Sequence, residues 1–171
     1  MKSQEKIDFY NKATKNILAR LDMLNLTKEQ HKKAEDLVKK FRDAFTKEEV
    51  KKATFLGPDN DMFWDLGYDS GGFCRVASIS FAIAMDFHDW QLMAIDDTQW
   101  PGKMSHHYLK HIPSGKFFDL TYDQFAVDGL TVPYNLGQKA AYSLSLQDEA
   151  HKFAKMVGID LIKSLIETKG K

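Results

Sequence analysis

Hydrophobic side chains recur every three to four residues at both ends of the chain, which is the spacing of helices with one buried face. Near the N-terminus this pattern predicts helices over residues 3 to 23, 27 to 45 and 46 to 53. Near the C-terminus it predicts one helix from Gln147 to Glu167. The two ends of the chain are therefore expected to be helical.

Polar residues mark where these helices begin. Thr27 with Gln30, and Thr46 with Glu49, have the spacing of capping boxes at the starts of the second and third helices. Ser145 is the expected N-cap residue of the last helix.

The middle of the chain has a different pattern. An apolar segment from Val76 to Phe87, opened by Cys74, is long enough for a buried helix. Short strands are predicted after it, at Trp90 to Ile95, Ser105 to Ile112 and Phe117 to Thr121. Helices followed by an antiparallel sheet and a further helix indicate the α+β class.

The expected organisation is one compact domain, in which a helical arm over residues 1–55 packs on an α+β core over residues 56–171. Residues 57–72 form the predicted loop between them, opened by a turn at Gly57–Asn60. This loop carries three aromatic residues, which either cover a cleft beside Cys74 or pack the arm onto the core: Phe63, Trp64 and Tyr68.

Composition limits the class of protein. The 171 residues include 43% hydrophobic residues, enough for a core, and 24 basic residues balance 24 acidic ones. A net charge of zero gives no general attraction to nucleic acid or to anionic membranes. The N-terminal segment lacks the apolar core of a signal peptide, so a soluble cytoplasmic protein without a membrane span is expected.

Cys74 is the only cysteine, so the chain can form no internal disulfide. It follows Gly71 and Gly72 at the expected start of a helix, where the helix dipole favours the thiolate. Histidines and an aspartate follow in the next predicted strands, an order of residues that suits nucleophilic catalysis by a thiol.

The predicted hairpin decides which histidine meets Asp119. A three-residue turn at Pro113–Gly115 puts His107 on the same face as Asp119, as a diagonal neighbour at roughly 7 to 8 Å. A two-residue turn puts His106 on that face instead, but roughly 13 Å away along the strand. Face and distance favour His107, and His106 is the alternative.

These residues predict a mechanism with Cys74 as the nucleophile, His107 as the base and acid, and Asp119 orienting His107. The backbone N–H of Cys74 is a candidate oxyanion donor. Candidates for a second donor, chosen by residue type alone, are Asn60, Gln99 and Trp100.

Two other interpretations compete with catalysis. A single cysteine in an apolar helix is often an inert buried thiol. His107 and His111 share a strand face, but no carboxylate lies between them in sequence, so no metal site is expected. No cofactor is expected either.

Two motifs resemble a known family. The segments Gly72–Ser78 and Gly115–Phe125, with His107 between them, resemble the transglutaminase-like branch of the papain-like cysteine-protease superfamily. In that family the cysteine opens a core helix, the histidine lies on the next-but-one strand and the aspartate lies on the following strand. Asp119-Leu-Thr-x-Asp-Gln-Phe is similar to the aspartate motif of small bacterial and phage members.

The resemblance implies a papain-like core with extra terminal helices and a Cys74, His107 and Asp119 triad. Many members have an aromatic residue two positions after the histidine, and Tyr108 fits this better if His106 is the catalytic one. The implied activity is that of a thiol-dependent hydrolase or acyltransferase (peptidase, amidase, deamidase or transglutaminase) on a peptide or protein amide. Some members are inactive, and the alternative is a protein-binding module that uses the N-terminal lysines Lys32, Lys33, Lys39 and Lys40.

Overall fold

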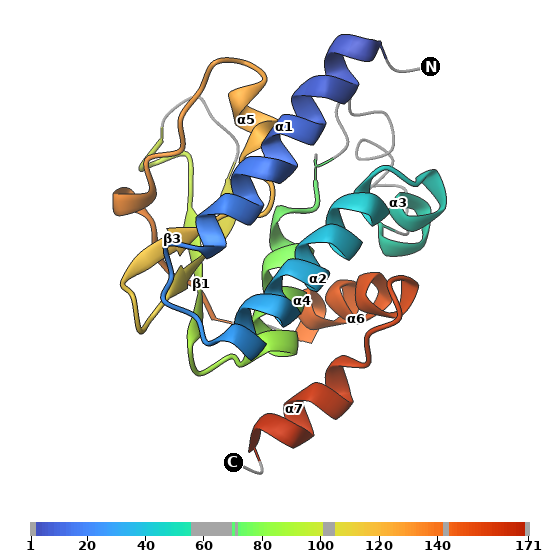
Figure 1. The fold of residues 1–171 in the computed structure, drawn as a ribbon, viewed down its shortest axis with the longest axis vertical. Coiled ribbons are helices and arrows are strands. Elements are labelled where there is room, and N and C mark those ends of the chain that lie inside the picture. The colour runs from blue at the N-terminus through green and yellow to red at the C-terminus, as the bar shows by residue number, and fades with distance from the viewer. Residues whose placement is uncertain (1–2, 56–69, 71, 101–104, 142–143, 170–171) are drawn as a thin grey trace.

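A computed structural model of the chain describes residues 3–55, 70, 72–100, 105–141 and 144–169 (Figure 1). It combines helices with one four-stranded antiparallel sheet, so the predicted α+β class is confirmed. The helices are α1 Gln4–Leu21, α2 Lys28–Phe45, α3 Glu48–Thr54, α4 Cys74–Met85, α5 Asp123–Ala126, α6 Leu144–Met156 and α7 Leu161–Lys169, with a 3₁₀ turn η2 at Tyr134–Leu136. The strands are β1 Trp90–Ile95, β2 His106–His111, β3 Lys116–Phe118 and β4 Gln138–Lys139.

Helix α4 is the centre of the fold. Its residues from Val76 to Ala84 are all buried, as expected of a helix that is apolar on every side. It contacts β1 and β2 of the sheet as well as α2, α6 and α7 (Figure 1). The first residue of this central helix is Cys74.

The N-terminal helices share the central core. Ile17, Leu21 and Phe41 of α1 and α2 belong to the same hydrophobic cluster as residues of α4 and the sheet. The Phe45 ring stacks on Phe73 at 4.5 Å, directly before Cys74. The helical arm therefore helps to fix the entry to α4.

The sheet has the strand order β3-β2-β1-β4. Strand β1 has the predicted bounds, and it pairs with β2 so that Ile95 lies opposite His106 and Trp90 opposite His111. Strand β4 was not predicted, because two residues are too few to show an alternating pattern.

The hairpin between β2 and β3 differs from the predicted three-residue turn. His111 pairs with Lys116, so four residues, 112–115, form the turn. The Ser114 hydroxyl hydrogen-bonds the His111 ring at 2.8 Å and accepts from the Lys116 N–H at 3.3 Å, and the Gly115 N–H donates to the His111 carbonyl at 2.8 Å. The predicted register is therefore wrong by one residue, because side-chain bonds within the turn favour the longer loop.

Helix starts were predicted with mixed success. The capping box of Thr27 and Gln30 at the start of α2 is confirmed. The box at Thr46 is wrong: Thr46 ends α2, its hydroxyl bonds the Asp43 carbonyl at 2.7 Å, and α3 begins after Lys47 without a side-chain cap. Asn25, with φ of 54°, makes the turn from α1 toward α2.

The predicted single C-terminal helix is wrong as well, since the structure has α6 and α7 instead. Gly158 separates them with a φ of 79°, a conformation that favours glycine. Ser145 is not an N-cap residue, because α6 begins at Leu144 and Ser145 lies within it. The predicted turn at Gly57–Asn60 and the aromatic residues Phe63, Trp64 and Tyr68 lie outside the described residues.

Candidate active site

The chain enters α4 through a constrained segment. Gly72 has a φ of 82°, which favours glycine, and Phe73 is fully buried. Cys74 follows as the first residue of α4 and is half-buried. The thiol therefore lies at the positive end of the central helix, as the sequence predicted.

His106, and not His107, is the histidine that bonds Asp119. The Asp119 carboxylate accepts from His106 Nε2 at 2.7 Å, and the imidazole is fully buried. Because the turn contains four residues, Asp119 falls on the strand face of His106. The predicted pairing of His107 with Asp119 is wrong for this reason, and the alternative partner, His106, is the one observed.

The Asp119 carboxylate is held on both oxygens. Oδ1 accepts from the backbone N–H of Thr121 at 3.0 Å and from its hydroxyl at 3.4 Å. Oδ2 accepts from Tyr134 at 2.9 Å in addition to His106. These four contacts use the hydrogen-bonding capacity of the carboxylate and fix its orientation.

The other edge of the His106 ring lies against Gln124. His106 Nδ1 is 3.3 Å from the Gln124 side-chain nitrogen, which also donates to the Thr121 hydroxyl at 3.0 Å. Phe125 packs edge-on against the ring at 4.8 Å. Asp119 and Gln124 thus contact the two nitrogens of the His106 ring.

The pKa values of Cys74 and His106 are both shifted in the direction that favours the charged form of the side chain. Burial raises the pKa of Cys74, but hydrogen bonds to His106 and His107, together with their positive charge, lower it to about 5. Burial lowers the pKa of His106, but Asp119 and the Cys74 thiolate raise it to about 10. A thiolate–imidazolium pair is therefore the favoured state at neutral pH.

His107 approaches the thiol from the same strand. Hydrogen bonding to His107 contributes to the lowered pKa of Cys74, after that to His106. The structure thus brings both histidines to Cys74, while Asp119 bonds His106.

Tyr134 was missed in the sequence, because it follows Pro133 in a segment without hydrophobic periodicity. Its backbone carbonyl accepts from the Tyr108 hydroxyl at 2.6 Å. A side chain at Gly137 would overlap that hydroxyl, so the close approach of the two segments requires glycine. Burial and the negative charge of Asp119 raise the pKa of Tyr134 well above its ordinary value, which keeps its hydroxyl protonated.

A buried ion pair ties the N-terminal helices to this region. Arg42 of α2 donates to both oxygens of Asp123 in α5, at 2.7 and 3.3 Å, and to the Leu120 carbonyl at 3.2 Å. Both charged side chains are almost completely buried. Helix α2 therefore holds the segment that directly follows Asp119.

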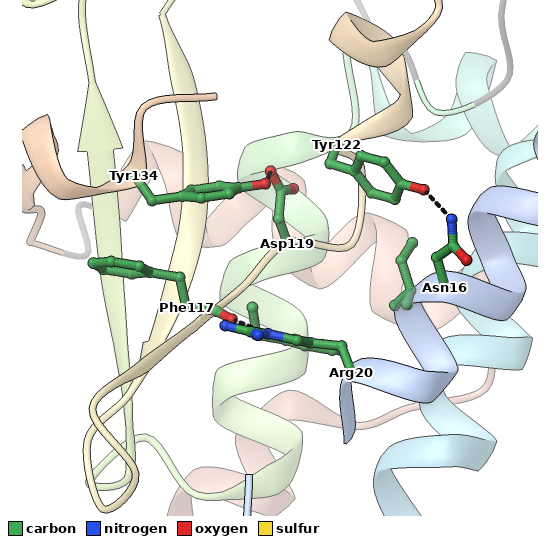
Figure 2. A pocket seen from close by; sticks show the side chains of 8 residues that line it. Asn16, Arg20, Phe117, Asp119, Tyr122 and Tyr134 are labelled. Atoms are coloured by element: carbon green, nitrogen blue, oxygen red, sulfur yellow. Dashed lines mark hydrogen bonds between the residues drawn. The ribbon is translucent and has the colours of Figure 1, made fainter. Parts of the chain in front are cut away.

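A cleft of about 300 Å³ opens beside Asp119, between α1 and β3 (Figure 2). Arg20 crosses it and donates to the Phe117 carbonyl at 3.0 Å, and Asn16 donates to the Tyr122 hydroxyl at 2.9 Å. Asp119 and Tyr134 are among the residues that line it.

The candidate oxyanion donors differ in position. The Gln99 side-chain oxygen accepts from the Asp96 N–H at 2.9 Å, within its own loop. Trp100 packs on Phe125 at 4.9 Å, and Phe125 in turn contacts His106. Asn60 lies outside the described residues.

Among the residues that the structure describes, no three histidine, cysteine or acidic side chains are grouped so that they could hold a metal ion. His111 instead bonds Ser114 and packs on Trp90 at 4.6 Å.

Comparisons with protein-family models, with curated proteins and with solved structures found no match to this chain. In the described ranges, none of the helices has both the length and the apolar character needed to cross a membrane.

Proposed function

We propose that the protein is a thiol-dependent hydrolase or acyltransferase that acts on an amide bond through Cys74, His106 and Asp119. One observation carries the proposal. A fully buried imidazole, bonded to Asp119 at 2.7 Å, acts on a half-buried thiol at the start of a helix, and His106 and His107 together lower the pKa of that thiol to about 5. Such a thiolate is nucleophilic at neutral pH.

The proposed chemistry has two steps. In the first, Cys74 Sγ attacks the amide carbonyl carbon, and the C–N bond breaks as His106 gives its proton to the leaving amine. In the second, water or an acceptor amine attacks the thioester, passes a proton to His106 and releases Cys74. Asp119 holds His106 in orientation and stabilises its cation throughout.

First-turn N–H groups of α4 have no partner within the helix, and they supply the donors for the carbonyl oxygen in the attacked state. The backbone N–H of Cys74 is the nearest of these to the sulfur. This arrangement needs neither a metal ion nor an organic cofactor for the acyl transfer itself.

The sequence resemblance supports the same class. A cysteine that opens the central helix, a histidine on the second strand after it and an aspartate directly after the next strand are the arrangement expected of a transglutaminase-like enzyme. The proposed substrate is accordingly an amide of a peptide or protein.

Alkylation by iodoacetamide tests the proposal. Because Cys74 is the only cysteine, every thiol adduct reports on this residue alone. We expect the folded protein to react at pH 6 at least about tenfold faster than the same chain in denaturant, because the folded thiol is ionised at that pH. A thiol that reacts only after denaturation would contradict the proposal.

The alternative of a catalytically inactive binding module has less support. Of the four lysines named for it, Lys39 is paired with Glu35 on the same helix at 2.7 Å. Such a mixed surface gives no clear preference for an acidic partner.

A further inference from the structure

We propose that Tyr134 is a positioning residue of this site: its hydroxyl fixes the Asp119 oxygen that bonds His106 and separates that oxygen from the water of the adjoining cleft. The inference rests on the proposed function, since it concerns how the same thiolate is stabilised. Tyr134 touches Asp119 and acts through it.

Two donors meet at one carboxylate oxygen. Asp119 Oδ2 accepts from His106 Nε2 at 2.7 Å and from the Tyr134 hydroxyl at 2.9 Å. The two donors approach from different segments of the chain, β2 and η2. Together they determine where Oδ2 lies relative to the imidazole.

The cleft explains why the hydroxyl matters. It is large enough for several water molecules, and both Tyr134 and Asp119 line it. Figure 2 shows the tip of the Tyr134 ring against the Asp119 carboxylate. If the hydroxyl were removed, water from the cleft could bond Oδ2, but it would not hold that oxygen in a fixed position.

Tyr134 is itself rigidly placed. The Tyr108 hydroxyl donates to its carbonyl at 2.6 Å, and its ring stacks on Phe117 at 5.7 Å. These contacts of the backbone and the ring fix the position of the Tyr134 hydroxyl. The substitution Tyr134→Phe therefore removes the hydroxyl oxygen and leaves the packing of the ring unchanged.

The site contains several other ionisable groups, and the test must separate Tyr134 from them. His106 and His107 face Cys74, and Tyr108 and Tyr122 face Tyr134. Arg20 lines the cleft from α1, and the Arg42–Asp123 pair lies behind the segment that follows Asp119.

The experiment is the pH dependence of Cys74 alkylation by iodoacetamide in the full chain, with Tyr134→Phe compared with wild type. A water-exposed Asp119 stabilises the imidazolium less, so the thiolate forms at higher pH. We expect the acidic limb of the profile to move up by at least about half a pH unit, and the rate at pH 5.5 to fall at least about 1.5-fold.

Tyr122→Phe is the matched control. Tyr122 lines the same cleft, but its hydroxyl bonds Asn16. This variant is expected to keep the wild-type profile. In an Asp119→Asn background, adding Tyr134→Phe is expected to cause no further shift, because Tyr134 acts through the carboxylate. A purely structural role would instead lower stability equally in both backgrounds without moving the pH profile.

The outcomes separate the two proposals. If wild-type Cys74 is unreactive in the folded protein, the proposed function fails. If wild type is reactive and Tyr134→Phe has an unchanged profile, only the role of Tyr134 is overturned. If Tyr134→Phe does not fold, Tyr108→Phe takes its place, because it removes the hydroxyl that holds the backbone carbonyl of Tyr134. This variant is expected to shift the acidic limb in the same direction. An unshifted profile in Tyr108→Phe overturns the inference.

Discussion

His106 and His107 are adjacent in sequence but have different surroundings. The first is fully buried and bonded to Asp119, and the second is partly exposed on the same strand. Because a buried imidazolium needs a compensating charge, Asp119 allows His106 to remain protonated beside the thiolate. The proposed base is thus defined by its carboxylate partner.

Replacement of each histidine by alanine tests this difference. For His106→Ala we expect the alkylation rate of Cys74 at pH 6 to fall at least about tenfold, because the thiol loses the strongest group that lowers its pKa. For His107→Ala we expect a smaller fall, measured under the same conditions. An equal or larger loss in His107→Ala would assign the base to His107.

At the scale of elements, Arg42 and Asp123 connect α2 with α5 next to the site. The Arg42 guanidinium also donates to the Thr14 hydroxyl at 2.9 Å and the Tyr10 carbonyl at 3.2 Å, and the Tyr10 hydroxyl bonds the Arg42 carbonyl. One side chain thereby joins α1, α2 and the segment after Asp119. Removal of either charge would leave its partner buried without compensation.

Arg42→Ala is expected to lower the free energy of unfolding by about 3 kcal/mol or more, measured by urea denaturation. Lys39→Ala on the same helix is the control. Lys39 pairs with Glu35 on the solvent-exposed side, so its loss is expected to leave the denaturation midpoint unchanged. Similar effects of the two substitutions would contradict a structural role for the buried pair.

At the scale of the whole molecule, the thiol couples folding to pH. The folded-state pKa of Cys74 is about 5, below its ordinary value of 9.0. Between these values Cys74 has released a proton in the folded protein that the thiol of the unfolded chain still holds, so ionisation of this side chain stabilises the fold more as the pH rises. His106, whose pKa is raised to about 10, keeps a proton in the folded protein and offsets this gain above its ordinary pKa of 6.5. The contribution of Cys74 is lost as the pH falls through about 5.

Comparison of wild type with Cys74→Ala measures that contribution. We expect the difference in unfolding free energy, wild type minus variant, to increase from pH 5 to pH 8 by at most about 1.4 kcal/mol per pH unit. Urea denaturation at several pH values provides the measurement. A difference independent of pH would mean that the thiol is not ionised in the folded protein.

Much of the fold could be predicted because its signals are local. The apolar run of α4, the spacing of α1 and α2, and the strand at Trp90–Ile95 depend on residues close in sequence. Cys74 and Asp119 were candidates for the same reason, since one opens a helix and the other follows a strand. The short strand β4 and the break at Gly158 lack such a signal.

The choice between His106 and His107 depended on a single turn. One added residue between β2 and β3 reverses the strand face that each position occupies, because side chains alternate along a strand. The Ser114 side chain favours the longer turn through its bonds to His111 and Lys116. The sequence favoured a three-residue turn over a two-residue turn, and the three-residue turn pairs Asp119 with His107.

The sequence by itself determined the α+β class, the cysteine at the start of the central helix and the presence of two candidate histidines near one aspartate. Only the tertiary structure decided that His106 bonds Asp119, that Tyr134 shares the same carboxylate oxygen and that Arg42 is buried against Asp123. The physical reason is distance along the chain. Periodicity and capping act over a few residues, whereas these contacts join segments brought together by the packing of the whole core.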